Sequence, residues 1–77
     1  MIDIRPELPD IFADVFLFTE PLTLHTGPDD VPKWDSLRHI ALVSAIEDAY
    51  DITLSMDEMM EMVDVRAIQG VLERHRV

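Results

Sequence analysis

Apolar residues recur at helical spacing along most of this chain, and no segment shows the sustained alternation of a half-buried strand. This pattern constrains the fold strongly, because a chain without strands must bury its apolar faces by packing helix against helix. With 77 residues, 48% of them hydrophobic, the chain is long enough for one core. We therefore predict an all-α bundle of three longer helices and one short helix, in a single domain over residues 1–77.

Prolines and a capping aspartate set the limits of the first two helices. Proline fits only in the first turn of a helix or before it, so the first helix is expected to begin near Pro9 and to end before Pro21. Residues 19–34 hold further prolines and an acidic pair, and they predict a long loop. Asp35 is a favourable N-cap for a second helix over residues 36–50.

Two further caps define the rest of the bundle. Ser55, followed three positions later by Glu58, forms a capping box for a short helix over residues 56–62. Asp64 is placed to cap a last helix over residues 65–75. The side chains expected to face the core are Ile11, Phe12, Val15, Phe16, Phe18, Leu37, Ile40, Leu42, Val43, Ile46, Tyr50, Val65, Ile68 and Leu72.

The charge balance narrows the choice of partners. Asp and Glu number 16 against 6 Lys and Arg, for a net charge of −10. Nucleic acids and anionic membrane surfaces require a basic footprint, so we expect neither as a partner. The charge predicts steering toward basic patches on other proteins, and a role in solubility alone is the alternative. We expect the protein to be a monomer. Self-repulsion at this charge density also lowers stability, which salt or divalent cations should partly restore.

Cysteine usage and the N-terminal sequence bear on the compartment. The chain has no cysteine, which excludes disulfides and thiolate chemistry and fits the reducing cytoplasm. No basic region followed by an apolar run is visible at the N-terminus, so no signal peptide is expected. The apolar segment 11–18 is far too short to span a bilayer. We expect a soluble, cytoplasmic protein.

The main chemical signal is the sequence Asp35-Ser36-Leu37, where the long loop meets the second helix. A serine at the first helical position presents its hydroxyl beside unpaired backbone N–H groups, at the positive end of the helix dipole. This environment favours a phosphate on the Ser36 oxygen. The simpler interpretation is that the aspartate and serine only start the helix.

The residues that follow strengthen the first interpretation. From Asp35 to Ile52 the chain reads DSLRHIALVSAIEDAYDI. This stretch resembles the core of the acyl carrier protein family, which shows Asp-Ser-Leu, aliphatic residues, an acidic pair, an aromatic residue and an Ile or Val at this spacing. The resemblance extends to Leu72 and is weak before Asp35. Ser36 matches the serine that the family modifies.

The resemblance implies a fold and a reaction. The fold would be an up-down helical bundle, and Ser36 would receive a 4'-phosphopantetheine arm from coenzyme A through a separate, magnesium-dependent phosphopantetheinyl transferase. The thiol of the arm would hold a cargo as a thioester. The chain itself would be a carrier and not an enzyme, acted on by acyl- or aminoacyl-loading enzymes and by condensing enzymes with basic docking surfaces.

Several positions depart from the family pattern. Carriers of general fatty acid synthesis usually present a strongly acidic outer face on the second helix, whereas this chain has Arg38, Ala41 and Ser44 there. Trp34 before the motif resembles standalone carriers of dedicated pathways, including D-alanyl-type carriers, and Asp51 replaces a frequent glycine. These departures favour a specialised carrier. The residues expected to contact partner enzymes are Asp35, Leu37, Arg38, Ala41, Ser44, Glu47 and Asp48.

Metal sites are not expected. His25, His39 and His75 have no spacing that places two of them on one helix face. We expect His39 to face solvent, with a contact to the phosphate as the alternative. The aspartates of the loop lack the spacing of a calcium-binding loop, so we interpret Asp29 and Asp30 as solvated.

Two features of the last third of the chain allow two interpretations each. Met56, Met59, Met60 and Met62 are expected to fill gaps around the short helix, and the alternative is an adaptable pocket for an acyl chain. Gly70, inside the last helix, indicates either close packing or plain tolerance at a cost of about 1 kcal/mol.

Three functions remain open at this point. The leading one is a discrete acyl carrier of fatty acid or specialised biosynthesis, such as polyketide or lipid synthesis. An aminoacyl (D-alanyl-type) or peptidyl carrier is the alternative, because cargo is chosen by the loading enzyme. A non-carrier acidic adaptor that binds a basic partner is the third.

Overall fold

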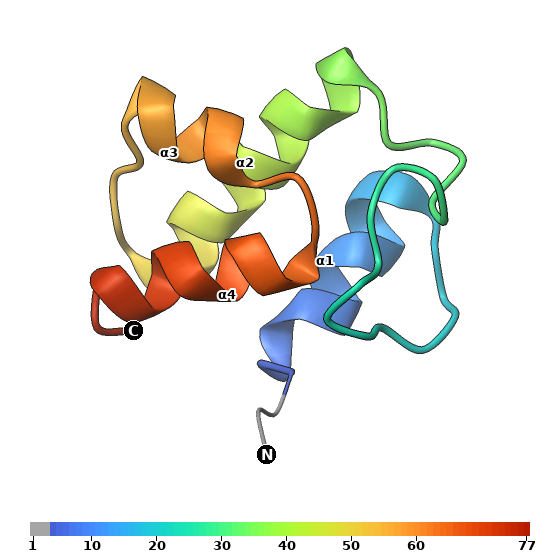
Figure 1. Cartoon of the computed structure of the whole chain (residues 1–77), viewed down its shortest axis with the longest axis horizontal. Helices are drawn as coiled ribbons and strands as arrows, with labels where there is room; N and C mark the ends of the chain where they lie inside the picture. The colour runs from blue at the N-terminus through green and yellow to red at the C-terminus, as the bar shows by residue number, and fades with distance from the viewer. Residues whose placement is uncertain (1–3) are drawn as a thin grey trace.

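The computed structural model describes residues 4–77, and its four helices are α1 (Glu7–Phe16), α2 (Ser36–Tyr50), α3 (Met56–Glu61) and α4 (Val65–Arg74). No strand occurs among these residues. The long loop between α1 and α2 lies on the right of Figure 1, and α3 and α4 lie together on the left. The predicted bundle of three longer helices and one short helix, with a long loop between the first two, is confirmed. Within residues 4–77, the structure has no helix with the length and apolar character needed to cross a membrane.

The predicted start of α1 is two residues late, whereas its end before Pro21 is as predicted. The helix begins at Glu7 and not near Pro9. Pro9 is still tolerated, because the first four N–H groups of a helix have no partner inside it. The helix ends well before Pro21, because Leu17 adopts a left-handed conformation with a φ of 54° and donates its N–H to the carbonyl of Phe12.

The inner face of α2 is narrower than the sequence predicted. Leu42, Val43 and Ile46 are buried as expected. Leu37 and Ile40 are 78% and 58% exposed, so their predicted burial is wrong. At 3.6 residues per turn, Leu37 lies opposite Leu42 and Ile46 and cannot reach the same core. The outer face of α2 is therefore less polar than expected.

The far end of α2 is tied back to α1. The Tyr50 Oη donates to Glu7 Oε1 at 2.8 Å. Burial is the main cause that raises the pKa of Tyr50 above its ordinary value, and this hydrogen bond is the second cause. The next residue, Asp51, adopts a left-handed conformation with a φ of 54°, which aspartate tolerates in turns.

Polar contacts hold α3, which has no fully buried residue. The predicted capping box is present: Ser55 Oγ accepts from the Glu58 N–H at 3.1 Å, and Glu58 Oε1 accepts from the Ser55 N–H at 3.0 Å. Glu58 Oε2 also lies 2.8 Å from His75 Nε2, and Glu61 pairs with Arg74, so both ends of α3 are tied to α4. The backbone hydrogen bond from Ser55 is the main cause that lowers the pKa of Glu58.

The long loop is pinned to the start of α4. Val65 donates its N–H to the carbonyl of Thr26 at 2.9 Å, which satisfies one of the free donors of the helix end. Gly27 is buried at this contact, and a Cβ there would lie 3.1 Å from the carbonyl oxygen of Val63. Gly70 differs, because a Cβ there would meet nothing within 4 Å, so the interpretation as plain tolerance holds.

Asp64 caps α4 as predicted, accepting from the Ala67 N–H at 2.8 Å.

The hydrophobic core contains residues of α1, α2 and α4 and of the long loop. Phe18 and Val15, predicted to face the core, are only partly buried against it. The buried hydrophobic residues are Leu8, Ile11, Phe12, Phe16, Val31, Trp34, Leu42, Val43, Ile46, Leu54, Met62, Val65, Ile68, Val71 and Leu72.

Candidate functional site

Ser36 stands at the first position of α2 with its side chain exposed. Asp35 is the N-cap: its Oδ1 accepts from the Arg38 N–H at 2.8 Å, and its carbonyl accepts from the His39 N–H at 2.9 Å. The cap therefore uses the third and fourth amides of the helix and leaves those of Ser36 and Leu37 beside the serine hydroxyl. Such an arrangement is suited to an anionic group, because the helix dipole and free amides both favour negative charge.

Trp34 anchors the residues that precede Ser36. Its ring is 7% exposed, stacks on Phe16 at a centroid distance of 5.1 Å and meets Phe12 edge-on at 5.5 Å. Its backbone N–H also bonds to the carbonyl of Val31 at 3.0 Å. The start of α2 is thus fixed by a buried aromatic cluster, while Asp35 and Ser36 are exposed to solvent.

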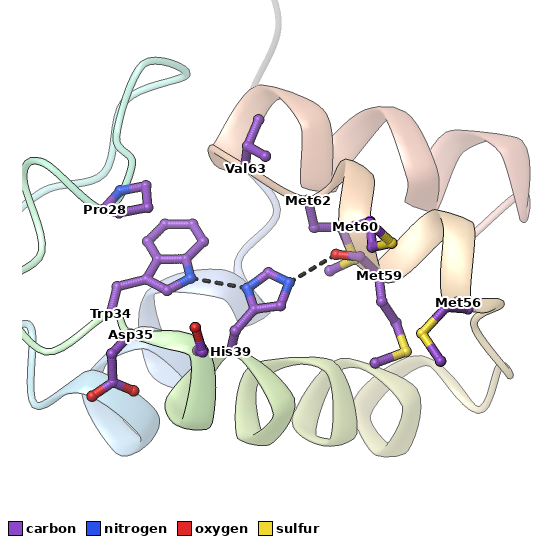
Figure 2. Close-up of a pocket in the computed structure, with 10 residues that line it drawn as sticks. Pro28, Trp34, Asp35, His39, Met56, Met59, Met60, Met62 and Val63 are labelled. Carbon is purple, nitrogen blue, oxygen red and sulfur yellow. Dashed lines mark hydrogen bonds between the residues drawn. The ribbon is translucent and has the colours of Figure 1, made fainter.

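A hydrogen-bond chain crosses from Trp34 to α3 through His39 (Figure 2). Trp34 Nε1 donates to His39 Nδ1 at 3.0 Å, and His39 Nε2 lies 2.8 Å from the carbonyl oxygen of Met59. An indole nitrogen only donates and a carbonyl only accepts, so the imidazole is neutral and carries its proton on Nε2. The prediction that His39 faces solvent is wrong, since both ring nitrogens are used inside the protein.

A pocket of about 480 Å³ opens beside Ser36, with α3 on its far side. All four methionines of the α3 region line it, and Met59 packs partly against the core as the gap-filling interpretation predicts. Met62 is also part of the core, whereas Met56 and Met60 are 70% and 72% exposed and fill no gap. The lining residues are Pro28, Trp34, Asp35, Ser36, His39, Met56, Met59, Met60, Met62 and Val63.

Comparison with known proteins gives one informative match. No family model and no curated protein matches the sequence. The solution NMR structure of a holo acyl carrier protein from Geobacter metallireducens matches with a TM-score of 0.78 and 29% identity, over 88% of this chain and 79% of that one. The chain is similar to this acyl carrier protein in fold and in sequence. Its Asp-Ser-Leu helix start and its long first loop agree with this similarity.

The residues expected to contact partners divide into two groups. Leu37, Ala41, Ser44 and Asp48 are exposed on the outer face of α2. The other three are engaged within the protein. Asp35 caps the helix, Arg38 Nη1 donates to the carbonyl of Val15 at 2.9 Å, and Glu47 Oε2 accepts from the Leu54 N–H at 2.8 Å.

The other candidate residues are not brought together. His75 pairs with Glu58, and Asp30 accepts from the Gly27 N–H at 3.1 Å as a turn residue. Among residues 4–77, no group of three or more His, Asp or Glu side chains is placed to hold a metal ion. His39 is the residue near Ser36 that sequence reasoning placed wrongly. The signal available for it was its position three residues after Ser36 and five after the tryptophan.

Proposed function

We propose that this chain carries acyl groups as thioesters on a 4'-phosphopantetheine arm attached to the Oγ of Ser36. The observation that supports this most directly is the exposed serine at the N-terminus of α2, in a chain whose structural neighbour is a holo acyl carrier protein. The arm, when attached, supplies the thiol that holds the cargo, which the cysteine-free chain lacks. The chain then acts as a non-catalytic, cytoplasmic carrier.

The residues around Ser36 fit a phosphodiester. The hydroxyl is accessible, and the amides of Ser36 and Leu37 remain available beside it because Asp35 binds the amides of the next two residues. The 15 residues of α2 give the helix end a full dipole, which favours the negative charge. Ser36 thus attaches and presents the arm, and the first turn of α2 stabilises its phosphate.

The cargo that we propose is an acyl group of a specialised pathway rather than of general fatty acid synthesis. The pocket beside Ser36 is walled mainly by thioethers and by the ring of Trp34, which suits an apolar chain better than a charged aminoacyl group. An aminoacyl or peptidyl cargo remains the alternative. Loading assays with acyl and aminoacyl donors on the same holo-protein distinguish the two.

The test of attachment uses the apo-protein, coenzyme A, magnesium and a phosphopantetheinyl transferase of broad specificity. We expect the intact mass to increase by one phosphopantetheine unit. Ser36→Ala should block the increase, whereas Ser44→Ala, which removes an exposed serine further along the same helix, should leave it unchanged. A wild-type mass that stays constant with several transferases would favour the acidic adaptor instead.

A further inference from the structure

Methionine is concentrated in α3 and directly after it. Four of the seven residues at 56–62 are methionine, out of five in the whole chain. Met56 and Met60 are 70% and 72% exposed, Met59 is partly buried, and Met62 is 1% exposed in the core. All four line one pocket, and in Figure 2 the side chains of Met56 and Met59 extend from α3 toward α2. One short segment thus presents the same side chain to a single pocket at very different levels of solvent access.

The thioethers are the side chains of this protein that are most open to two-electron oxidation. The sequence has no cysteine, so no thiolate of the chain competes for the oxidant. Solvent access governs the susceptibility of each sulfur, and it separates Met56 and Met60 from Met62. The net charge is −10 and every charged residue at 56–62 is acidic, so anionic oxidants are repelled. The oxidant class that reaches α3 is therefore a neutral hydroperoxide, such as hydrogen peroxide.

Oxidation of Met56 and Met60 changes the pocket without changing the core. A sulfoxide oxygen is a hydrogen-bond acceptor that stays hydrated, and covering it with an apolar ligand removes that water at a cost. Both side chains lie outside the buried core, so the helices keep their packing. The same reaction at Met62 would place an oxygen among buried apolar side chains and destabilise the fold. The exposed pair is therefore a place where oxidation alters binding and not folding.

We propose that Met56 and Met60 form a reversible oxidation site that controls the binding of an apolar chain in this pocket. Each sulfur attacks one peroxide oxygen with a lone pair. The O–O bond breaks, an S–O bond forms, and the second oxygen leaves as water. The sulfur loses two electrons and the peroxide gains them. A methionine sulfoxide reductase reverses the change, with two electrons and two protons from a dithiol that becomes a disulfide. The proposal rests on the apolar pocket of the proposed function and not on the attachment at Ser36.

The first measurement maps the oxidation of the full chain by hydrogen peroxide. Mass spectrometry of the tryptic peptide 39–66, with fragmentation to assign each sulfoxide, follows all four methionines in one experiment. We expect Met56 and Met60 to be oxidised at least about tenfold faster than Met62, with Met59 between them. Equal rates at the exposed and buried positions, or oxidation of Met62 first, would overturn the proposal.

The second measurement is the binding of Nile red, a neutral fluorescent dye, before and after treatment with peroxide. We expect its Kd to rise by about fivefold or more in the wild type, and methionine sulfoxide reductases with dithiothreitol to restore it. The control combines Met56→Leu with Met60→Leu, which keeps apolar side chains and leaves no thioether at the two positions. Each protein is compared with its own untreated form, and the Kd of the double variant should not change on treatment.

The results that contradict the proposal are distinct from one another. A Kd that stays constant in the oxidised wild type would show that the pocket does not respond. An equal loss of affinity in the double variant would place the effect at another methionine. Unfolding by far-UV circular dichroism, at the degree of oxidation that changes the Kd, would make the effect damage to the fold. If the untreated wild type does not bind the dye, the pocket is not an apolar site and this proposal fails, whereas the mass increase at Ser36 still decides the attachment.

Discussion

Replacing His39 by leucine removes the hydrogen-bond chain that joins Trp34 to α3. The new side chain is apolar and of similar size. The ring makes two hydrogen bonds, at 3.0 Å to Trp34 Nε1 and at 2.8 Å to the carbonyl of Met59. The two rings lie nearly in one plane, with an interplanar angle of 12°, which aligns the indole N–H with the imidazole nitrogen. Since α3 buries no residue fully, this contact is one of few that hold it against α2.

The magnitude follows from these contacts. Two hydrogen bonds contribute about 1–3 kcal/mol together, and the indole N–H is left without its acceptor beside the core. We expect His39→Leu to lower the free energy of unfolding by about 2–3 kcal/mol. For a chain of this length that corresponds to a fall in Tm of about 10–20 °C. The total stability is on the order of 4–11 kcal/mol, so the variant should still fold.

The assay is urea unfolding followed by the far-UV circular dichroism of the helices, because Trp34 is the single tryptophan of the chain and is replaced in part of the series. His25→Leu is the matched control, because His25 is exposed, and it should change stability by less than about 0.5 kcal/mol. A double-mutant cycle with Trp34→Phe should give a coupling of about 1 kcal/mol for His39 and none for His25. Equal effects of the two histidine variants, or zero coupling, would refute the role of His39.

Three further outcomes are expected. Gly70→Ala should stabilise the protein by about 0.5–1 kcal/mol, because an added Cβ there meets no atom within 4 Å. Gly27→Ala should destabilise it, because the added Cβ would lie 3.1 Å from a carbonyl oxygen. Thermal melting of both variants checks this, and changes in Tm of the same sign would contradict it. Because the pKa of Glu58 is lowered in the folded protein, its ionised carboxylate stabilises the fold above the ordinary glutamate pKa of about 4.3. This stabilisation is lost as pH falls through the folded pKa. The stability of Glu58→Gln should therefore decrease less on acidification than that of the wild type. Salt or magnesium should raise Tm for a chain of net charge −10, and a Tm indifferent to both would count against self-repulsion.

The sequence predicted those parts of the fold that depend on local chemistry. Asp35, Ser55 and Asp64 cap their helices as expected, because an N-cap needs only a short polar side chain and the amides that follow it. Burial was harder to predict, because it depends on which neighbours a helix meets. Leu37 and Ile40 are aliphatic residues within a helix, as the core residues of α2 are. Only the direction of α2 relative to α1 shows that they face outward.

The candidate site divides in the same way. Ser36 and its cap could be identified from adjacent residues. The place of His39 could not, since its two partners lie in the loop before α2 and in α3, and only the packing of α3 brings the Met59 carbonyl within reach. The pocket beside Ser36 likewise depends on long-range packing, so the sequence left both interpretations of the methionines open.

The central claim, that Ser36 bears the arm and its cargo, is tested most directly on protein purified from the cells that make it. Peptide mass spectrometry would locate any modification and identify what it carries. We predict phosphopantetheine on the peptide that contains Ser36, with an acyl group on its thiol. Native protein that is unmodified, or modified at another residue such as Ser44, would contradict the account.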